Sequence, residues 1–238
     1  MKIALIGYGK MGKAIERIAL ERGHQIVLTI DVQNLHEFTP ENIQKAQVAI
    51  EFTNPEQAPD NVRKCLEAGA AVVSGSTGWQ DQLPSMIQLC KAKNGSLIWS
   101  SNYSIGVNLF MKINRMLARM LHPFPSYDVE MQEIHHIHKL DKPSGTAISL
   151  AEAIFKETDR KTHWELEKAS GPDALKSDVV RLGEEAGTHT VRWHSPIDEI
   201  TLSHKANNRE GLAFGAVLAA EYIYDKKGIF TMEDVLKF

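Results

Sequence analysis

The sequence contains few cysteines, no long apolar run and no large excess of charge. Its two cysteines, Cys65 and Cys90, form no CxxC motif and lie in segments with helical periodicity. They are therefore predicted to be buried free thiols of a reducing compartment rather than parts of a disulfide framework. No apolar run reaches the roughly 18 residues that a membrane helix needs, and the opening MKIALIG is not followed by a signal-peptide cleavage pattern. These absences predict a cytoplasmic protein without a membrane partner.

The charge balance argues against nucleic acid as a partner. The 27 lysines and arginines are outnumbered by 30 aspartates and glutamates, which gives a net charge of -3. Such a chain has no general basic surface to neutralise a phosphate backbone. With 238 residues, 43% of them hydrophobic, it can build one large core or two modest ones. A globular protein with locally built binding sites is expected.

Apolar runs of strand length recur through the first hundred residues. They lie at residues 2–6, 25–30, 48–52, 70–74 and 96–100. Segments with helical periodicity separate several of them, at residues 11–22, 56–68 and 80–93. Strands that are apolar on both faces and alternate with helices are typical of a parallel sheet covered by helices on each side. The first half therefore predicts an α/β domain of the Rossmann type.

A glycine-rich segment, GYGKMG, connects the first predicted strand to the first predicted helix. Its residues are Gly7, Tyr8, Gly9, Lys10, Met11 and Gly12. In the G-x-G-x-x-G pattern the first glycine allows a tight turn, the second lets a pyrophosphate approach, and the third packs the helix on the strand. A turn of purely structural value is the alternative. The position between strand and helix favours dinucleotide binding, because free amides at the helix N-terminus attract the pyrophosphate.

An acidic residue follows at the distance expected for a ribose ligand. Asp31 stands at the end of the second predicted strand, 24 residues after Gly7, and its carboxylate can bind ribose hydroxyls. Val32 comes next, so no arginine stands there to receive a 2'-phosphate. The sequence therefore favours NADH over NADPH. NADPH stays an alternative, because Lys10 in the glycine-rich loop can contact a phosphate.

Three loops with small polar side chains follow predicted strands of the same domain. They are FTNPE (52–56), which contains Thr53, SGSTGW (74–79) and SSNYSIG (100–106). In such folds these loops meet at the carboxyl edge of the sheet, where ligands bind. Ordinary turn chemistry is the alternative for each loop taken alone. Three such loops beside a cofactor loop predict a pocket for the nicotinamide.

The pattern changes after a predicted helix at 107–121. Segments with stronger alternation, typical of strands with one polar face, lie at 127–139, 163–169, 178–183, 187–194 and 197–206. They predict a second domain of α+β type. The terminal helical segments are expected to return to the first domain, which gives a dinucleotide-binding domain of residues 1–104 and 213–238 and a second domain of residues 105–212.

The stretch EIHHIHKLDKPSGTA, Glu133 to Ala147, concentrates histidines and lysines in front of a predicted helix. If it is a strand throughout, Glu133, His135 and Lys139 share one face and His136 and His138 the other. Adjacent histidines then point in opposite directions, and no second group of ligands completes a metal site, so no metal is expected. Core histidines without function are a further alternative.

The end of the same stretch predicts a receptor for an anion. Ser144, Gly145 and Thr146 precede the predicted helix 147–156, so that free amides and hydroxyls gather at its N-terminus. With Lys139 nearby, these groups predict a site that binds a small anionic substrate and protonates it.

These motifs resemble those of the dihydrodipicolinate reductase (4-hydroxy-tetrahydrodipicolinate reductase) family. The likeness covers nearly the whole chain, through GYGKMG, FTNP, GSTG, SNYSIGVN, EIHHIHKLDKPSGTA, VRLGEEAGTH and SHKANNREGLAFGAVLAAEY. It implies NAD(P)H-dependent reduction of 4-hydroxy-tetrahydrodipicolinate (dihydrodipicolinate) to tetrahydrodipicolinate, in lysine biosynthesis by the diaminopimelate pathway. It also implies a second domain with a mixed, open sheet that binds the substrate and assembles a homotetramer.

The resemblance also assigns roles to residues. It implies that His135 and Lys139 form the catalytic pair, and that His136, with Gly145 and Thr146 beside Ser144, binds the substrate carboxylate. Lys139 is the predicted proton donor, while His135 assists proton transfer or polarises the intermediate. Contacts to the nicotinamide end are implied for Gly75, Ser76, Thr77, Ser100, Ser101, Asn102 and Tyr103.

Two other functions fit the same residues. Another NAD-linked dehydrogenase of similar layout, acting on an amino acid such as aspartate, would share the first domain and would also need cationic residues for carboxylates. A non-catalytic NAD-sensing module is the second alternative, and it would tolerate the loss of Lys139. Activity on the cyclic dicarboxylate distinguishes the reductase from both.

Overall fold

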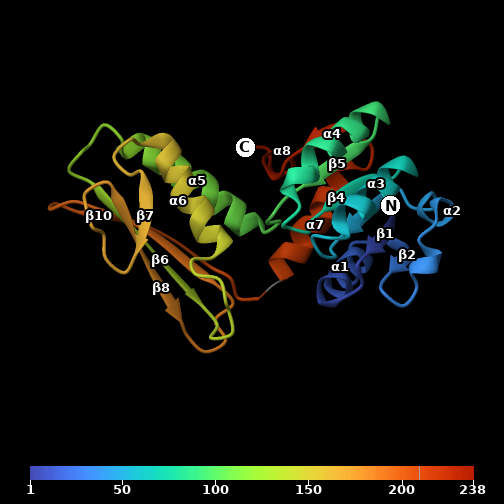
Figure 1. Cartoon of the computed structure of the whole chain (residues 1–238), viewed down its shortest axis with the longest axis horizontal. Coiled ribbons are helices and arrows are strands. Elements are labelled where there is room, and N and C mark those ends of the chain that lie inside the picture. The colour runs from blue at the N-terminus through green and yellow to red at the C-terminus, as the bar shows by residue number, and fades with distance from the viewer. Residues whose placement is uncertain (209) are drawn as a thin grey trace. The chain divides into compact units, whose positions relative to one another are not determined.

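Two units, each with its own β-sheet, make up the chain (Figure 1). The computed structural model describes residues 1–208 and 210–238. The first unit contains Met1–Ile105 and Glu210–Phe238, and the second contains Gly106–Arg209. Among the described residues, no helix combines the length and the apolar character that a membrane crossing requires.

The sheet of the first unit is parallel throughout and has the strand order β11-β5-β4-β3-β1-β2. Its strands are β1 (Lys2–Ile6), β2 (Gln25–Ile30), β3 (Val48–Glu51), β4 (Ala71–Ser74), β5 (Ser96–Trp99) and β11 (Gly228–Phe230). The predicted Rossmann-type sheet is confirmed, and β11 is a strand that the sequence did not predict. Because the strand order reverses between β1 and β3, the loops after these two strands diverge and leave a crevice for a ligand.

Helices cover both faces of this sheet. The helices are α1 (Lys10–Glu21), α2 (Pro40–Ile43), α3 (Ala58–Glu67), α4 (Leu83–Ala92), α7 (Glu210–Ile223) and α8 (Met232–Leu236), with 3-10 turns at Leu35–Glu37 and Gln80–Gln82. On β1, Ile3 and Leu5 pack with α1 and α7, while Ala4 and Ile6 pack with α3 and α4. Alternate residues of each central strand thus face opposite helical layers, which explains why the strands are apolar on both sides.

The small residues of α7 allow it to approach the sheet closely. Figure 1 shows α7, coloured orange to red, lying against the blue α1 although the two are far apart in sequence. A Cβ at Gly215 would overlap the carbonyl oxygen of Tyr103, so glycine is required there. The terminal helices belong to the first unit, and α7 packs in its core.

The second unit has a mixed sheet with the strand order β10-β9-β6-β8-β7. Its strands are β6 (Asp128–His135), β7 (His163–Leu166), β8 (Ala174–Arg181), β9 (Thr188–His194) and β10 (Glu199–Lys205). β6 pairs antiparallel with β9 and parallel with β8. The helices α5 (Ile105–Leu121) and α6 (Gly145–Glu157) cover one face, where their apolar residues pack on Val129, Met131 and Trp193. The predicted α+β architecture is confirmed.

Three predicted strands in this unit have the wrong bounds, and one of them, 163–169, ends at Leu166. The strand predicted for 127–139 ends at His135, because Lys139 donates a backbone hydrogen bond to the carbonyl of His136 and closes a turn. The strand predicted for 178–183 starts at Ala174 and ends at Arg181. The alternation of faces therefore holds for Glu133 and His135, which are both buried, and fails for the residues that follow.

Candidate active site

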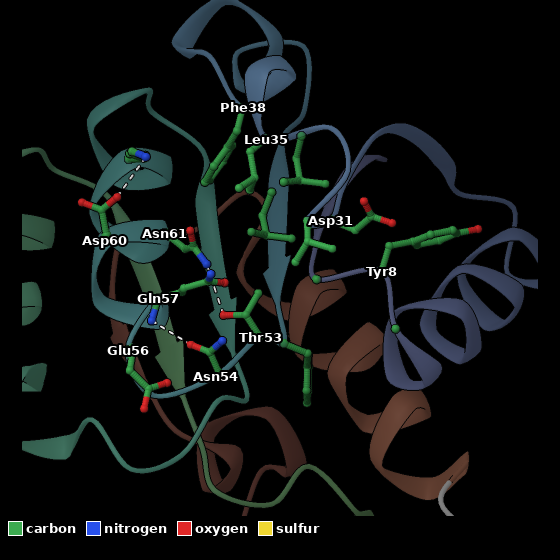
Figure 2. Close-up of a pocket in the computed structure, with 17 residues that line it drawn as sticks. Tyr8, Asp31, Leu35, Phe38, Thr53, Asn54, Glu56, Gln57, Asp60 and Asn61 are labelled. Atoms are coloured by element: carbon green, nitrogen blue, oxygen red, sulfur yellow. Dashed lines mark hydrogen bonds and ion pairs between the residues drawn. The ribbon is translucent and has the colours of Figure 1, made fainter.

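A cavity of about 670 Å³ opens in the crevice between β1 and β3. Gly7, Tyr8 and Gly9 line it on the β1 side, and Thr53 and other residues after β3 line the opposite side (Figure 2). Its volume falls in the range of cofactor sites. The sequence thus predicted where the first unit has room for a dinucleotide.

The glycine-rich loop has the geometry that a pyrophosphate requires. Gly7 has a φ of +96°, and a Cβ there would overlap the carbonyl oxygen of Phe52. A Cβ at Gly12 would overlap the carbonyl oxygen of Gly7, so these two glycines hold the strand, loop and helix together. A Cβ at Gly9 would meet nothing within 4 Å, and no side chain caps the start of α1. The amides at this helix start are therefore open to a phosphate.

One end of the cavity suits an adenosine. Figure 2 shows Leu35, Phe38 and Asp31 around that end. The Oδ1 atom of Asp31 accepts a hydrogen bond of 2.7 Å from the amide of Gln33, so the carboxylate is held in the loop after β2. Leu35 and Phe38 offer apolar contact to a base. Neither residue could be predicted as a cavity residue, because the segment between β2 and β3 shows no periodicity in sequence that would place it there.

A second cavity of about 230 Å³ lies where the nicotinamide end was predicted. It is lined by Met11, Phe52, Thr53, Asn54, Pro55, Gly75, Ser76 and Thr77. Loops after β3 and β4 therefore meet at one place, as the sequence predicted for the carboxyl edge of the sheet.

The loop after β5 does not reach either cavity. Neither is lined by Ser100, Ser101, Asn102 or Tyr103, and neither is lined by Lys10 or Gly12. The Tyr103 side chain is 1% exposed, and its hydroxyl donates a hydrogen bond of 2.8 Å to the carbonyl of Ser74. Burial raises the pKa of Tyr103 well above its ordinary value. Tyr103 thus supports the sheet edge, and its predicted contact to the cofactor stays a prediction.

A buried carboxylate organises the candidate substrate site in the second unit. Glu133 is 1% exposed and lies near the end of β6. Its Oε2 atom is 3.7 Å from Nδ1 of His135 and 3.6 Å from Nε2 of His189, and its Oε1 atom is 3.2 Å from Arg181. Both oxygens accept hydrogen bonds from the amide of Ser144, at 3.2 and 3.1 Å. Glu133 thus connects β6, β8 and β9 to the start of α6.

The electrostatics of this cluster fix two charge states at neutral pH. Burial alone would raise the pKa of Glu133, but hydrogen bonds from His189 and Ser144 lower it to about 2, so it is ionised. Burial lowers the pKa of His135 to about 4 against the opposing attraction of Glu133, so its imidazole is neutral. A Cβ at Gly187 would lie 3.1 Å from Nε2 of His135, so glycine leaves room for this ring.

The turn after β6 carries the other predicted catalytic residue. Lys139 is 21% exposed in its side chain, and its Nζ atom lies 2.8 Å from Oδ1 of Asp141. Arg181 donates hydrogen bonds to the carbonyls of Lys139 and Asp141, at 3.4 and 2.6 Å, and thereby supports the turn. His138 forms a separate, exposed pair with Glu184, in which its Nε2 atom lies 3.5 Å from Oε1 of the carboxylate.

The start of α6 has the form expected of an anion receptor. Ser144 is its N-cap and accepts a hydrogen bond of 3.2 Å from the amide of Ala147. No side chain is bonded to the amides of Gly145 and Thr146 in the described structure, and a Cβ at Gly145 would meet nothing within 4 Å. The buried Nδ1 atom of His136 has no partner among the described residues. These groups can bind a carboxylate.

A metal ion is the alternative occupant of this cluster. Glu133, His135 and His189 offer one ligand atom each, and these atoms lie within 4.8 Å of one another. The Glu133 carboxylate is in contact with a guanidinium, which repels a cation, and it already accepts the Ser144 amide. The expectation that no metal binds here stays a prediction.

We expect the free energy of unfolding to decrease as the pH falls below about 6.5. Between 6.5 and 4 the unfolded chain protonates His135 while the folded chain does not, and between 4.5 and 2 the same holds for Glu133. Both groups therefore favour unfolding in acid, on the order of 3 kcal/mol each. Denaturant unfolding at a series of pH values measures this. In His135→Gln the decrease between pH 6.5 and 4 should become smaller, and an unchanged decrease would contradict the assignment.

Comparison with known proteins assigns the chain to one family. The family description "Dihydrodipicolinate reductase, N-terminus" matches residues 1–103, and "Dihydrodipicolinate reductase, C-terminus" matches residues 106–236. The 4-hydroxy-tetrahydrodipicolinate reductase of Christiangramia forsetii is 44% identical over 99% of this chain and 98% of the relative. That of Archaeoglobus fulgidus is 35% identical over the full length of both chains.

A solved structure shares the fold over the whole chain. The dipicolinate-bound dihydrodipicolinate reductase of Paenisporosarcina sp. TG-14 superposes with a TM-score of 0.81, at 24% identity, and covers 97% of each chain. The two matched family descriptions together span both units, and the relatives align from end to end. The chain therefore belongs to the dihydrodipicolinate reductase family.

Proposed function

We propose that this protein reduces 4-hydroxy-tetrahydrodipicolinate to tetrahydrodipicolinate with NADH or NADPH, a step of lysine biosynthesis through diaminopimelate. The observation that carries the proposal is the cluster of the second unit, in which His135, the Lys139 turn and the open start of α6 are joined through Glu133 and Arg181. Membership of the reductase family supports the same reaction.

The start of α6 is our candidate site for a carboxylate of the substrate. Gly145 and Thr146 offer amides, the hydroxyl of Ser144 lies beside them, and His136 has a buried nitrogen without a partner in the described structure. The Paenisporosarcina reductase, which has the same fold, binds dipicolinate, a cyclic dicarboxylate. A helix start favours negative charge because its amides and its dipole point toward the ligand.

The charge state of His135 supports Lys139 as the proton donor. His135 is neutral at pH 7 because its pKa lies at about 4, so it carries no proton that it readily releases as an acid. Lys139 carries an ammonium group that is paired with Asp141 at the edge of the cluster. His135 instead offers a neutral ring, which has one nitrogen that donates a hydrogen bond and one that accepts a hydrogen bond. When bound, the nicotinamide supplies the hydride.

The cofactor is proposed to be NADH in preference to NADPH. The Asp31 carboxylate lies where a 2'-phosphate would repel it, and the exposed Val32 offers no positive charge. We expect the double variant Asp31→Ser, Val32→Arg to raise the ratio of kcat/KM for NADPH over NADH by about tenfold or more, which is about 1.4 kcal/mol. Asp60→Ser, which changes another acid of the same cavity, is the matched control and should leave the ratio unchanged.

A homotetramer in the cytoplasm is proposed as the working form. The helices of the second unit cover one face of its sheet, and the opposite face carries Glu130, Gln132, Thr190 and Arg192 without a covering layer in the described chain. An uncovered sheet face is a candidate surface for association with other copies. Light scattering during size exclusion should give four times the chain mass, and a monomer mass at micromolar concentration would contradict the proposal.

The reaction itself is tested by oxidation of NADH with substrate generated in situ by the synthase that precedes this step. Rapid oxidation with the cyclic dicarboxylate, and none with aspartate or other open-chain amino acids, is expected. The reverse pattern would favour an amino-acid dehydrogenase. NADH binding without oxidation on any of these compounds would favour the sensing module.

A further inference from the structure

A second buried carboxylate, in the first unit, has no role in the reaction described so far. Glu51 is the last residue of β3, and its side chain is fully buried. No cation forms an ion pair with it in the described part of the chain, whereas buried carboxylates are ordinarily paired with one. Its surroundings therefore have to satisfy it by hydrogen bonds alone.

Four donors, from the loops after β3 and β4 and from the last residue of β4, surround this carboxylate. The Oε1 atom accepts hydrogen bonds from the amide and hydroxyl of Thr53, at 2.9 and 2.5 Å, and from the hydroxyl of Ser76 at 2.8 Å. The Oε2 atom accepts one of 2.6 Å from the hydroxyl of Ser74. Thr53 belongs to the loop after β3 and Ser76 to the loop after β4. Glu51 thus connects the two loops through hydrogen bonds to its carboxylate.

The same two residues line the cavity at the predicted nicotinamide end. Ser76 is also held from its other side, because the indole nitrogens of Trp79 and Trp99 both donate to its carbonyl oxygen, at 2.8 and 2.9 Å. Because its hydroxyl donates a hydrogen bond to Glu51 and its carbonyl accepts two from the indoles, Ser76 has little freedom to move. The position of the cavity wall therefore depends on the Glu51 carboxylate.

We propose that Glu51 is a positioning residue for the cofactor, which holds Thr53 and Ser76 in the arrangement that receives the nicotinamide end. The proposal rests on the proposed function, because it takes this cavity as part of the dinucleotide site. Hydrogen bonds to a charged acceptor are stronger than neutral ones, so one carboxylate can fix both loops before the cofactor arrives.

The variant Glu51→Gln keeps the size of the side chain and replaces one acceptor oxygen by a donating amide. The oxygen that remains is uncharged and is a weaker common acceptor for Thr53 and Ser76, and the new amide forces the Ser74 hydroxyl to accept where it now donates. We expect the Kd for NADH to rise about ten- to hundredfold. The value of kcat at saturating NADH should stay within about twofold, since residues that only position the cofactor affect its binding more than the chemical step.

A purely structural carboxylate would behave differently. Glu221 serves as the control, since it is bonded to Arg22 and His24 in the same unit, at 2.8 and 2.7 Å, and lines neither cavity. Glu221→Gln should lower the thermal midpoint without changing the Kd for NADH. If Glu51→Gln likewise lowers only the midpoint, or lowers kcat while the KM for NADH is unchanged, the proposal is wrong.

Binding is measured by energy transfer from tryptophan to NADH, because Trp79 and Trp99 are bonded to the Ser76 loop. Ser74→Ala is the second variant, in case Glu51→Gln does not fold. Ser74 lines neither cavity, so a rise in Kd on removal of its hydroxyl has to act through Glu51. An unchanged Kd in Ser74→Ala would count against the proposal.

The binding assay also separates this inference from the proposed reaction. If the wild type binds NADH but does not reduce the dicarboxylate, the proposed function fails. A higher Kd in Glu51→Gln would still support the positioning role in that case.

Discussion

Replacement of Lys139 by alanine is expected to lower kcat by a factor of about 10² to 10⁴, the usual contribution of a positioned acid. The Nζ atom of Lys139 lies 2.8 Å from Oδ1 of Asp141 in the turn after β6. His135 is neutral at pH 7, so it has no acidic proton with which to replace Lys139. Steady-state oxidation of NADH at saturating substrate measures the effect. The Kd for NADH should be unchanged, because Lys139 lines neither cavity of the first unit.

Two matched variants show whether the decrease in kcat is caused by the loss of the proton donor. Lys142→Ala removes an exposed lysine three residues further along the same loop and should leave kcat within about twofold. Lys139→Arg retains a positive charge but releases a proton far less readily, so it should remain nearly as slow as the alanine variant. If Lys139→Arg is active, Lys139 acts by charge alone and the proton comes from elsewhere.

Replacement of Glu133 by alanine is expected to destabilise the fold by about 3–5 kcal/mol. The change leaves the guanidinium of Arg181 and the amide of Ser144 without their buried acceptor. Both thermal and denaturant unfolding measure this change, and the kcat of the remaining folded protein should also decrease, because His135 and the start of α6 lose their common support.

Glu130→Ala is the control on the same strand. Glu130 lies on the opposite face of β6, is 24% exposed in its side chain and is paired with Arg192 and Lys176. Partly exposed ion pairs contribute about 1 kcal/mol or less. Similar losses in the Glu130 and Glu133 variants would mean that Glu133 does not organise the cluster.

The first unit could be predicted well because its signals are local. Each predicted strand from 2–6 to 96–100 corresponds to a strand of the sheet within a residue or so, and GYGKMG stands between β1 and α1. Strands buried on both faces leave a continuous apolar run, and a glycine with positive φ is required where Gly7 turns. β11 was missed because three residues carry no periodicity.

The second unit was harder to predict at the position that matters most. The strand predicted for 127–139 was extended because Ile137 and the alternating histidines continue its pattern, although the backbone turns after His135. Beyond the end of the strand, the amide of Ile137 donates to the carbonyl of Gly183, and this bond joins residues distant in sequence. No local pattern could have revealed it.

Several residues of the candidate site were missed for the same reason. Arg181 and His189 come from β8 and β9, and only the sheet register brings them to Glu133. Glu51 lies inside an apolar run, and a charged residue in such a strand is a signal for a buried polar role.

The split of the first unit has a consequence for synthesis on the ribosome. Most of its sheet is made early, but α7, which covers one face of that sheet, comes after the entire second unit. Domains made first usually fold first. Here the second unit is continuous and is complete as soon as it emerges, whereas the nascent first unit exposes apolar surface until Glu210–Ile223 has left the exit tunnel. The unit that begins the chain is therefore the last to finish folding.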